Sequence, residues 1–329
     1  MLSTIVILVI IFALIFEFIN GFHDTANAIA TSVYTRALSV RNAIILASSM
    51  NFVGALVNEK VAKTITELVD VSIEEYVILA ALIGAIIWNL LTWWKGIPSS
   101  SSHALIGSLI GAVIVHMMSV SHIVWPVVVE KVIVPLFASP IVGFFIGYSF
   151  MKLIFILFAS WNPARVNRVF SKLQIISAGF VAFSHGANDA QKTMGIITLA
   201  LITGDFLSAD AGVPLWVKFV CACVITLGTS VGGYRIMKTM GGGVTKLEPA
   251  GGFAAQTSAA SIIMLMSMLG APISTTHVIT TSVMGVGSAK RISAVKWSVA
   301  KDIILTWIIT LPLTALMGGA CALIFGLVW

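Results

Sequence analysis

Six stretches of this sequence are apolar over about the length that an α-helix needs to cross a lipid bilayer. A span requires about 20 consecutive, mostly apolar residues. The stretches lie near residues 2–20, 42–58, 132–158, 174–202, 215–233 and 301–328. Because backbone polar groups inside a bilayer must bond within the protein, helices are the simplest way to cross it. The pattern therefore predicts an all-α, polytopic membrane protein.

The composition is that of a chain surrounded mostly by lipid. Apolar residues make up 58% of it and charged residues only 10%, and the mean hydropathy is +1.04, whereas soluble domains carry about 25% charged residues. This excludes a soluble enzyme, a disordered chain and a nucleic-acid-binding protein with a basic surface. The net charge of +6 is spread over short connections and indicates membrane orientation. The three cysteines lie in apolar runs and predict neither a disulfide framework nor a zinc site.

Two further apolar regions, 76–120 and 252–288, are each interrupted by a proline. Pro98 and Pro272 remove a backbone donor where a continuous helix would otherwise run, and hydroxyl residues and a histidine follow each of them. An ordinary loop between two spans is one explanation. The other is a re-entrant hairpin whose tip lies inside the bilayer, where broken backbone persists only if protein or a watery cavity satisfies it.

The distribution of charge favours the hairpins. Basic clusters mark cytoplasmic connections, and they lie at residues 36–41, 165–172, 235–246 and 290–301. Acidic residues gather at 67–75 and 205–210 instead. With the basic clusters inside, the region 76–120 begins and ends outside, whereas 252–288 begins and ends inside. Each half then consists of two spans, a hairpin and a last span, and the two halves have opposite orientations.

Three short motifs recur in the same order, 165 to 175 residues apart. Residues 21–27 (GFHDTAN) match 186–192 (GANDAQK), residues 98–103 (PSSSSH) match 272–277 (PISTTH), and Lys60, Lys63 and Thr64 match Arg235, Lys238 and Thr239. Duplicated halves of opposite topology with paired broken helices are typical of secondary transporters, whose site lies between the repeats. A duplicated scaffold with only a structural role is the alternative.

The repeat also predicts the domain organisation. Residues 1–160 form a first inverted repeat in the membrane, residues 161–173 a cytoplasmic connection, and residues 174–329 a second inverted repeat. The predicted fold class is therefore an all-α polytopic membrane protein with two inverted-topology repeats and paired re-entrant or broken helices.

Two matched aspartates, Asp24 and Asp189, lie in or beside long apolar runs. An ionised carboxylate there costs at least about 2.5–3.5 kcal/mol, so each is expected to have a cation or a proton as its partner. For Asp24, a place at the membrane interface is the alternative. Gly21 and Gly186 precede the aspartates and predict an unwound turn that frees carbonyl oxygens. Oxygen ligands suit a small hard cation, and we expect sodium at both aspartates, with further ligands from Thr25, Asn27, Asn188 and Thr193.

The second pair of motifs places hydroxyl residues at two helix starts. Ser101 and Ser102 follow the first proline, and Thr275 and Thr276 follow the second. Hydroxyl side chains cap helix starts, and helix starts bind anions through free N–H groups and the positive end of the dipole. Two such starts that meet inside the membrane would hold a tetrahedral oxyanion, whereas either motif alone could be a simple cap. We expect supporting roles for three neighbours, namely His103, His277 and Lys192.

These motifs resemble those of the inorganic phosphate transporter (PiT) family. The most specific parts are the tract of residues 185–195 (HGANDAQKTMG) and the tip of residues 272–277. The resemblance implies an inverted-repeat membrane fold, usually dimeric, that imports phosphate with sodium or protons. The family's functional residues correspond to Asp24, Asn27, Ser101, Ser102, Asp189, Thr275 and Thr276.

The sequence departs from the family pattern at three places. His23 replaces the asparagine that usually precedes the first aspartate, and Asn51 and Gln256 stand where eukaryotic members have intramembrane glutamates. Neutral amides at those two places can still ligate an oxyanion or sodium, but they leave fewer titratable groups. We therefore include Asn51 and Gln256 among the expected phosphate-binding residues.

The sequence thus predicts a secondary active transporter, not an enzyme, that imports inorganic phosphate by sodium symport and alternating access. It is expected to be a homodimer in the cell (inner) membrane, with sodium as coupling ion, no cofactor and no nucleic-acid partner. Three alternatives stay open: protons in place of sodium, sulfate in place of phosphate, and an intramembrane serine protease that uses Ser102 and His103. The last requires a serine and a base that face each other, and neighbours at a helix start point apart.

Overall fold

A computed structural model describes residues 3–69, 73–232, 236–237, 239 and 243–327, and this part of the chain is helical with no strand. The matched residues Arg235 and Lys238 lie outside the described residues. The α-helices are α1 (Thr4–Tyr34), α2 (Val40–Ala55), α3 (Lys60–Thr66), α4 (Glu75–Lys95), α5 (Ser101–Met117), α6 (Trp125–Val127), α7 (Val134–Leu157), α8 (Pro163–Thr203), α9 (Leu215–Val231), α11 (Pro249–Met268), α12 (Thr275–Lys290) and α13 (Trp297–Gly326). A π-helical segment, Val128–Ile133, joins α6 to α7, and a 3-10 turn, Ile292–Ala294, precedes α13.

Four of the described helical segments are long and apolar enough to cross a membrane: α1, α4, the continuous segment Trp125–Leu157 and α13. Helices α2 and α3 meet the same criterion as a pair bent by 67°, and α5 and α9 are shorter apolar helices. The prediction of an all-α, multi-pass membrane protein is confirmed. The individual spans differ from the predicted ones, because α1 continues to Tyr34 and α8 already begins at Pro163.

The outer surface of this molecule is more apolar than that of a soluble protein. Large apolar side chains cover the outside of α7 and α13, where Phe145 is 62% and Leu316 70% exposed. Carboxylate, amide and hydroxyl side chains of α1, α5, α8 and α12 are buried instead. A lipid environment accounts for both observations, since hydrocarbon accepts apolar side chains and leaves polar groups to bond inside the protein.

Each of the two interrupted regions forms a helical hairpin. Gly96 follows α4 directly and Gly270 follows α11 closely; both glycines have left-handed φ, of 68° and 74°. Left-handed glycine is the common terminator of a helix, and Pro98 and Pro272 then keep the chain extended until the next helix begins. The residues of both tips are buried. The breaks therefore lie in the protein interior, as predicted for re-entrant hairpins, and not in surface loops.

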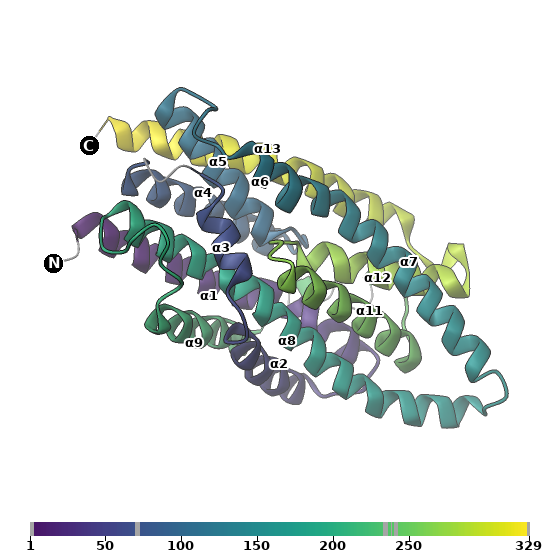
Figure 1. Ribbon diagram of the computed structural model, residues 1–329. Coiled ribbons are helices and arrows are strands. Elements are labelled where there is room, and N and C mark those ends of the chain that lie inside the picture. The colour runs from purple at the N-terminus through teal and green to yellow at the C-terminus, as the bar shows by residue number, and fades with distance from the viewer. Residues whose placement is uncertain (1–2, 70–72, 233–235, 238, 240–242, 328–329) are drawn as a thin grey trace.

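The two hairpins lie toward opposite ends of the molecule (Figure 1). The start of α1, the end of α5 and the end of α13 lie at one end, and the end of α12 and the start of α8 lie at the other. The acidic segments meet near the first end, where Glu67 and Asp210 line the same cavity of about 960 Å³. The charge pattern predicts that both acidic segments lie on the same side of the membrane, and this arrangement agrees with that prediction.

The predicted unwound turns at Gly21 and Gly186 are wrong, because α1 and α8 run through both glycines without a break. Close packing explains the glycines. A Cβ atom on Gly21 would lie 2.6 Å from the carbonyl oxygen of Ile225 in α9, and one on Gly186 would lie 2.8 Å from the Cα atom of Asn51 in α2. Small residues let membrane helices approach closely, and here they bring α9 and α2 against the aspartate-bearing helices.

Gly186→Ala should therefore destabilise the protein, whereas Gly179→Ala on the same helix should not. The new methyl group at 186 meets the backbone of α2, which cannot move aside as a side chain can, and overpacking of this kind costs about 1–3 kcal/mol. At Gly179 the nearest atom to an added Cβ is a leucine side-chain carbon at 3.6 Å, an ordinary contact. Thermal unfolding of both variants in detergent measures the difference; equal melting temperatures would contradict the packing explanation.

Candidate substrate and cation site

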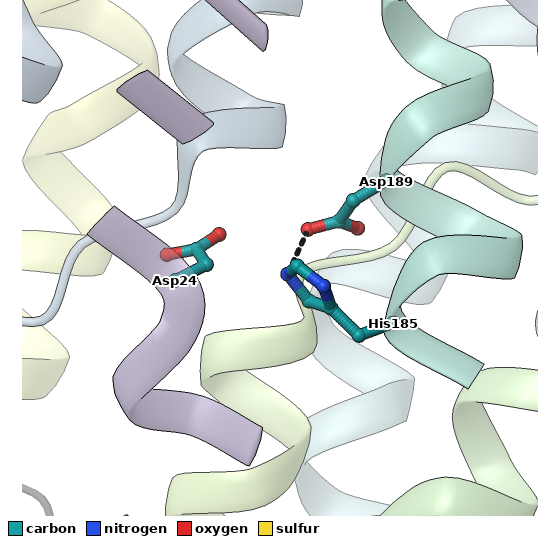
Figure 2. A group of neighbouring side chains, drawn as sticks. All are labelled: Asp24, His185 and Asp189. Atoms are coloured by element: carbon teal, nitrogen blue, oxygen red, sulfur yellow. Dashed lines mark ion pairs between the residues drawn. The ribbon is translucent and has the colours of Figure 1, made fainter. Parts of the chain in front are cut away.

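The two matched aspartates meet inside the molecule. Asp24 in the middle of α1 is 2% exposed, and Asp189 in α8 is fully buried. Ligand atoms of Asp24, Asp189 and His185 all lie within 4.8 Å of one another. Figure 2 shows Asp24 facing His185 and Asp189 across the gap between their helices. Because α1 continues for ten residues beyond Asp24, this carboxylate lies within its helix and not at the helix end.

Asp24 is surrounded by polar side chains from three segments. Its neighbour His23 lies 2.7 Å away through Nδ1, and Ser101 at the start of α5 donates a hydrogen bond of 2.9 Å to Oδ2. The same serine hydroxyl lies 2.8 Å from the amide oxygen of Asn20. Thr276 at the start of α12 contacts Oδ1 at 3.5 Å. Both hairpin tips therefore reach the first aspartate.

Asn27 and Thr25 of the first motif are also predicted sodium ligands, and their side chains differ in what they leave free. The amide nitrogen of Asn27 donates to the hydroxyl of Thr276 at 2.8 Å, while its amide oxygen is buried and has no hydrogen-bond partner in the described part of the chain. The hydroxyl of Thr25 instead donates to the Gly21 carbonyl of its own helix, at 2.5 Å. Asn27, three residues after Asp24 on α1, thus has an amide oxygen free for a ligand, whereas Thr25 is engaged with the backbone.

Asp189 has a lysine as its closest partner. The ammonium group of Lys192 lies 2.5 Å from Oδ1 and donates also to the Ser102 hydroxyl and, at 3.0 Å, to the Ile273 carbonyl. Thr275 and His185 both contact Oδ2, at 3.2 and 3.1 Å. The lysine therefore joins the second aspartate to the tips of both hairpins.

The two tips are in direct contact, since the hydroxyl of Ser102 donates to the carbonyl of Ile273 at 3.1 Å. Ser100 caps α5 by accepting from the amide of His103, and Ser274 caps α12 by accepting from the amide of His277. These caps leave the first two amides of each helix without an acceptor in their own helix. These first two amides are those of Ser101 and Ser102 in α5, and of Thr275 and Thr276 in α12.

The two tip histidines form a small stack behind the helix starts. The ring centroids of His103 and His277 are 5.0 Å apart, and the ring of His277 stacks on Trp307 at 3.9 Å. The ring nitrogens of both histidines have no hydrogen-bond partner among the described residues. Since Ser102 bonds to Lys192 and Ile273 and not to His103, the pair does not form the serine–histidine couple of a protease.

Four of the predicted site residues have hydrogen-bond partners other than the two aspartates. Asn51 bonds to His185 and Thr229, and so stands behind the histidine rather than at the tips. The side chain of Gln256 accepts from Ser177 and donates to Ser32. Asn188 anchors the second tip through the carbonyl of Ala271 at 3.1 Å. The hydroxyl of Thr193 donates to Glu17.

Three residues at the site were absent from the predicted set. Glu17 is fully buried, accepts from Thr193, and has one carboxylate oxygen without a hydrogen-bond partner in the described part of the chain. His185 joins Asp189 to Asn51, and Asn20 shares Ser101 with Asp24. The signal for Glu17 was present in the sequence, because it is a single charge within the apolar run 2–20.

Comparison with known proteins decides the family. Residues 20–318 match the pattern of the "Phosphate transporter family". The chain belongs to this family. It is 46% identical over 98% of its length to a "Probable low-affinity inorganic phosphate transporter" of Bacillus subtilis, covering 98% of that protein. It is 45% identical to a protein of the same description from Rhizobium meliloti, with 94% of this chain and 93% of that protein covered.

A solved structure has the same fold. "The sodium-dependent phosphate transporter" superposes with a TM-score of 0.89 at 26% identity, and the match covers 99% of this chain and 100% of the other. The family resemblance predicted from the motifs is therefore confirmed. As a member of a transporter family, the chain is not an enzyme, which removes the protease alternative.

Proposed function

We propose that this phosphate transporter imports inorganic phosphate by symport with sodium across the cell (inner) membrane, as a homodimer. The observation that carries the proposal is the meeting of two helix starts and two aspartates at one buried place, with Ser102 of one tip bonded to Ile273 of the other. The sodium dependence named for the protein of the same fold supports sodium as the coupling ion.

In this proposal, phosphate binds between the tips. A phosphate dianion would accept hydrogen bonds from the free amides and hydroxyl groups of Ser101, Ser102, Thr275 and Thr276, aided by the positive ends of two helix dipoles. The carboxylates of the aspartates lie beside these donors and would repel the dianion. A bound sodium ion removes that repulsion, so each ion raises the affinity for the other by the same factor.

The first aspartate is the better place for sodium. Asp24 supplies a carboxylate, and Asn27 supplies a buried amide oxygen that has no other partner in the described part of the chain. Oxygen ligands of these two kinds suit a small hard cation. We therefore assign the coupling sodium to Asp24 and Asn27.

Transport then requires the loaded site to open to each side in turn. We assign residues 1–160 and 174–329 to two inverted repeats, each with one hairpin whose tip reaches the site. Because the hairpins extend toward opposite ends (Figure 1), movement of one against the rest would expose the tips to one side at a time. Alternating access of this kind is the usual mechanism of inverted-repeat transporters.

Proton coupling is the second candidate, and Glu17 favours it. This carboxylate is fully buried, accepts a hydrogen bond from Thr193, and has one oxygen without a hydrogen-bond partner in the described part of the chain. A carboxylate at such a place needs a cation or a proton. If the protein is proton-coupled, Glu17 is the residue best placed to carry the proton.

Uptake into liposomes that contain the purified protein tests the proposal. Labelled phosphate and labelled sulfate are each offered with an inward sodium gradient, with an inward proton gradient and with neither. We expect phosphate to accumulate under the sodium gradient and sulfate to accumulate at least about tenfold less, because a site lined by acceptors as well as donors favours an anion with its own hydroxyl group. Accumulation under the proton gradient alone would contradict sodium coupling, and Glu17→Gln should then abolish it.

A further inference from the structure

Asn27 and Lys192 stand at corresponding places in the two matched motifs. Each follows its aspartate by three residues, Asn27 after Asp24 and Lys192 after Asp189. Side chains three apart on a helix lie on the same face, so each residue is a neighbour of its aspartate. The first motif therefore presents a neutral amide at this place and the second presents an ammonium group.

The ammonium group of Lys192 has the surroundings of a bound cation. It contacts the carboxylate of Asp189 at 2.5 Å, the carbonyl of Ile273 at 3.0 Å and the hydroxyl of Ser102. An ammonium group has three donors and no acceptor, so three oxygens satisfy it completely. Carboxylate, carbonyl and hydroxyl oxygens are also the ligands of hard metal cations. The side chain is 1% exposed, and the ammonium group fills the place where the motif predicts sodium.

Both carboxylate oxygens of Asp189 already have close partners, and the nearest of these is a cation. Lys192 uses Oδ1, while His185 and Thr275 both contact Oδ2. A sodium ion at this carboxylate would also lie beside a like charge, which repels it strongly inside a protein.

The surroundings of Asp24 are different. Its one ion-pair partner among the described residues is His23, and no lysine or arginine of that part of the chain contacts it. The amide oxygen of Asn27 is buried there without a hydrogen-bond partner, although buried polar atoms are nearly always bonded. This candidate cation site has an oxygen ligand, the amide of Asn27, that the second motif lacks.

We propose that Lys192 is a built-in cation that permanently occupies the second coupling position, so that the aspartate pair binds one sodium ion, at Asp24, and not two. The proposal rests on the sodium coupling proposed for the same site. Charge balance within the aspartate pair supports it, because its two carboxylates and the ammonium group of Lys192 leave a single negative charge, which one monovalent cation neutralises. Each transport cycle then needs one sodium ion fewer than the duplicated motifs alone would suggest.

Counting bound sodium tests this proposal. Binding of radioactive ²²Na⁺ to the purified protein is measured to saturation for the unmodified chain and for Lys192→Asn, which gives the second motif the residue of the first. We expect Lys192→Asn to bind one additional sodium ion per chain. Lys192→Gln, which nearly keeps the length of the side chain, serves as a second variant if the first does not elute as a monodisperse protein. An unchanged sodium count in a folded Lys192 variant would overturn the proposal.

A complementary measurement leaves Lys192 in place. Asp24→Asn should remove the sodium bound by the aspartate pair, so that adding Asp189→Asn removes no further ion. A sodium ion that Asp24→Asn retains and the double variant loses would overturn the proposal. The sodium counts also distinguish failure of this proposal from failure of the proposed sodium coupling. If Lys192→Asn binds one sodium and the unmodified chain binds none, the built-in cation stands and sodium coupling fails; if neither binds sodium, both fail.

Discussion

Asp24→Asn should reduce sodium-driven phosphate uptake by about a hundredfold or more while the protein still inserts into the membrane. The carboxylate is the charged ligand of the proposed sodium site and also accepts a hydrogen bond from Ser101 at the first tip. Removing one partner of a buried charge pair costs about 3–5 kcal/mol, and each 1.4 kcal/mol corresponds to a tenfold loss of occupancy. Initial rates of labelled phosphate uptake into liposomes measure the effect.

Asp302→Asn is the matched control for this prediction. Asp302 also lies on a membrane helix, α13, but its side chain is exposed. The same change of charge there should leave the uptake rate unchanged within about twofold, because an exposed carboxylate interacts weakly with its surroundings. Sodium-driven uptake by Asp24→Asn at more than a tenth of the unmodified rate, at equal amounts of inserted protein, would argue against the cation assignment.

The breaks in the hairpins were predictable because their causes are local. Proline lacks a backbone donor and left-handed glycine ends a helix, so Gly96 with Pro98 and Gly270 with Pro272 specify where each helix must stop. The pairing of the motifs then predicted that the tips belong to one site. The contact between Ser102 and Ile273 is the structural counterpart of that prediction.

The role of the glycines was not predictable from the sequence, because glycine has two uses. It allows backbone conformations that other residues avoid, and it also allows another helix to approach closely. The sequence does not say which helix packs on Gly21, and only the approach of α9 shows that the second use applies. The unwound turns were wrong for this reason.

The polar network behind the site depends on contacts between distant segments. His185 reaches Asn51, and Thr193 reaches Glu17. Nothing in the local pattern around these residues indicates such partners. A single carboxylate within an apolar run was the one signal available for Glu17, since such residues in membrane helices are rare and usually face the interior.

Thr275→Pro should weaken phosphate binding about ten- to a hundredfold more than Thr275→Ala. Thr275 is the first residue of α12, and its amide is one of the free donors proposed to bind the anion. Proline fits at a helix's first position because no helical acceptor exists for that amide, and Ser274 before it already has extended backbone, with φ of −86° and ψ of 108°. Both variants lose the hydroxyl contact with Asp189, and proline alone loses the amide. A hydrogen bond to a charged group contributes about 1.5–3 kcal/mol. Since each 1.4 kcal/mol corresponds to a tenfold change in affinity, loss of the amide should weaken phosphate binding by about ten- to a hundredfold.

Two further variants separate loss of the donor from damage to a helix start. Val40→Pro places proline at the first position of α2, after Ser39, whose backbone is also extended with φ of −67° and ψ of 153°. That variant should bind phosphate as the unmodified protein does, because α2 starts far along the chain from either tip and contributes no donor to them. Ser101→Pro at the first tip, compared with Ser101→Ala, should show the same excess loss as Thr275→Pro if the anion lies between both helix starts. Equal phosphate affinity of the proline and alanine variants at both tips would mean that side chains alone bind the anion, and the paired helix starts would then serve only to position them.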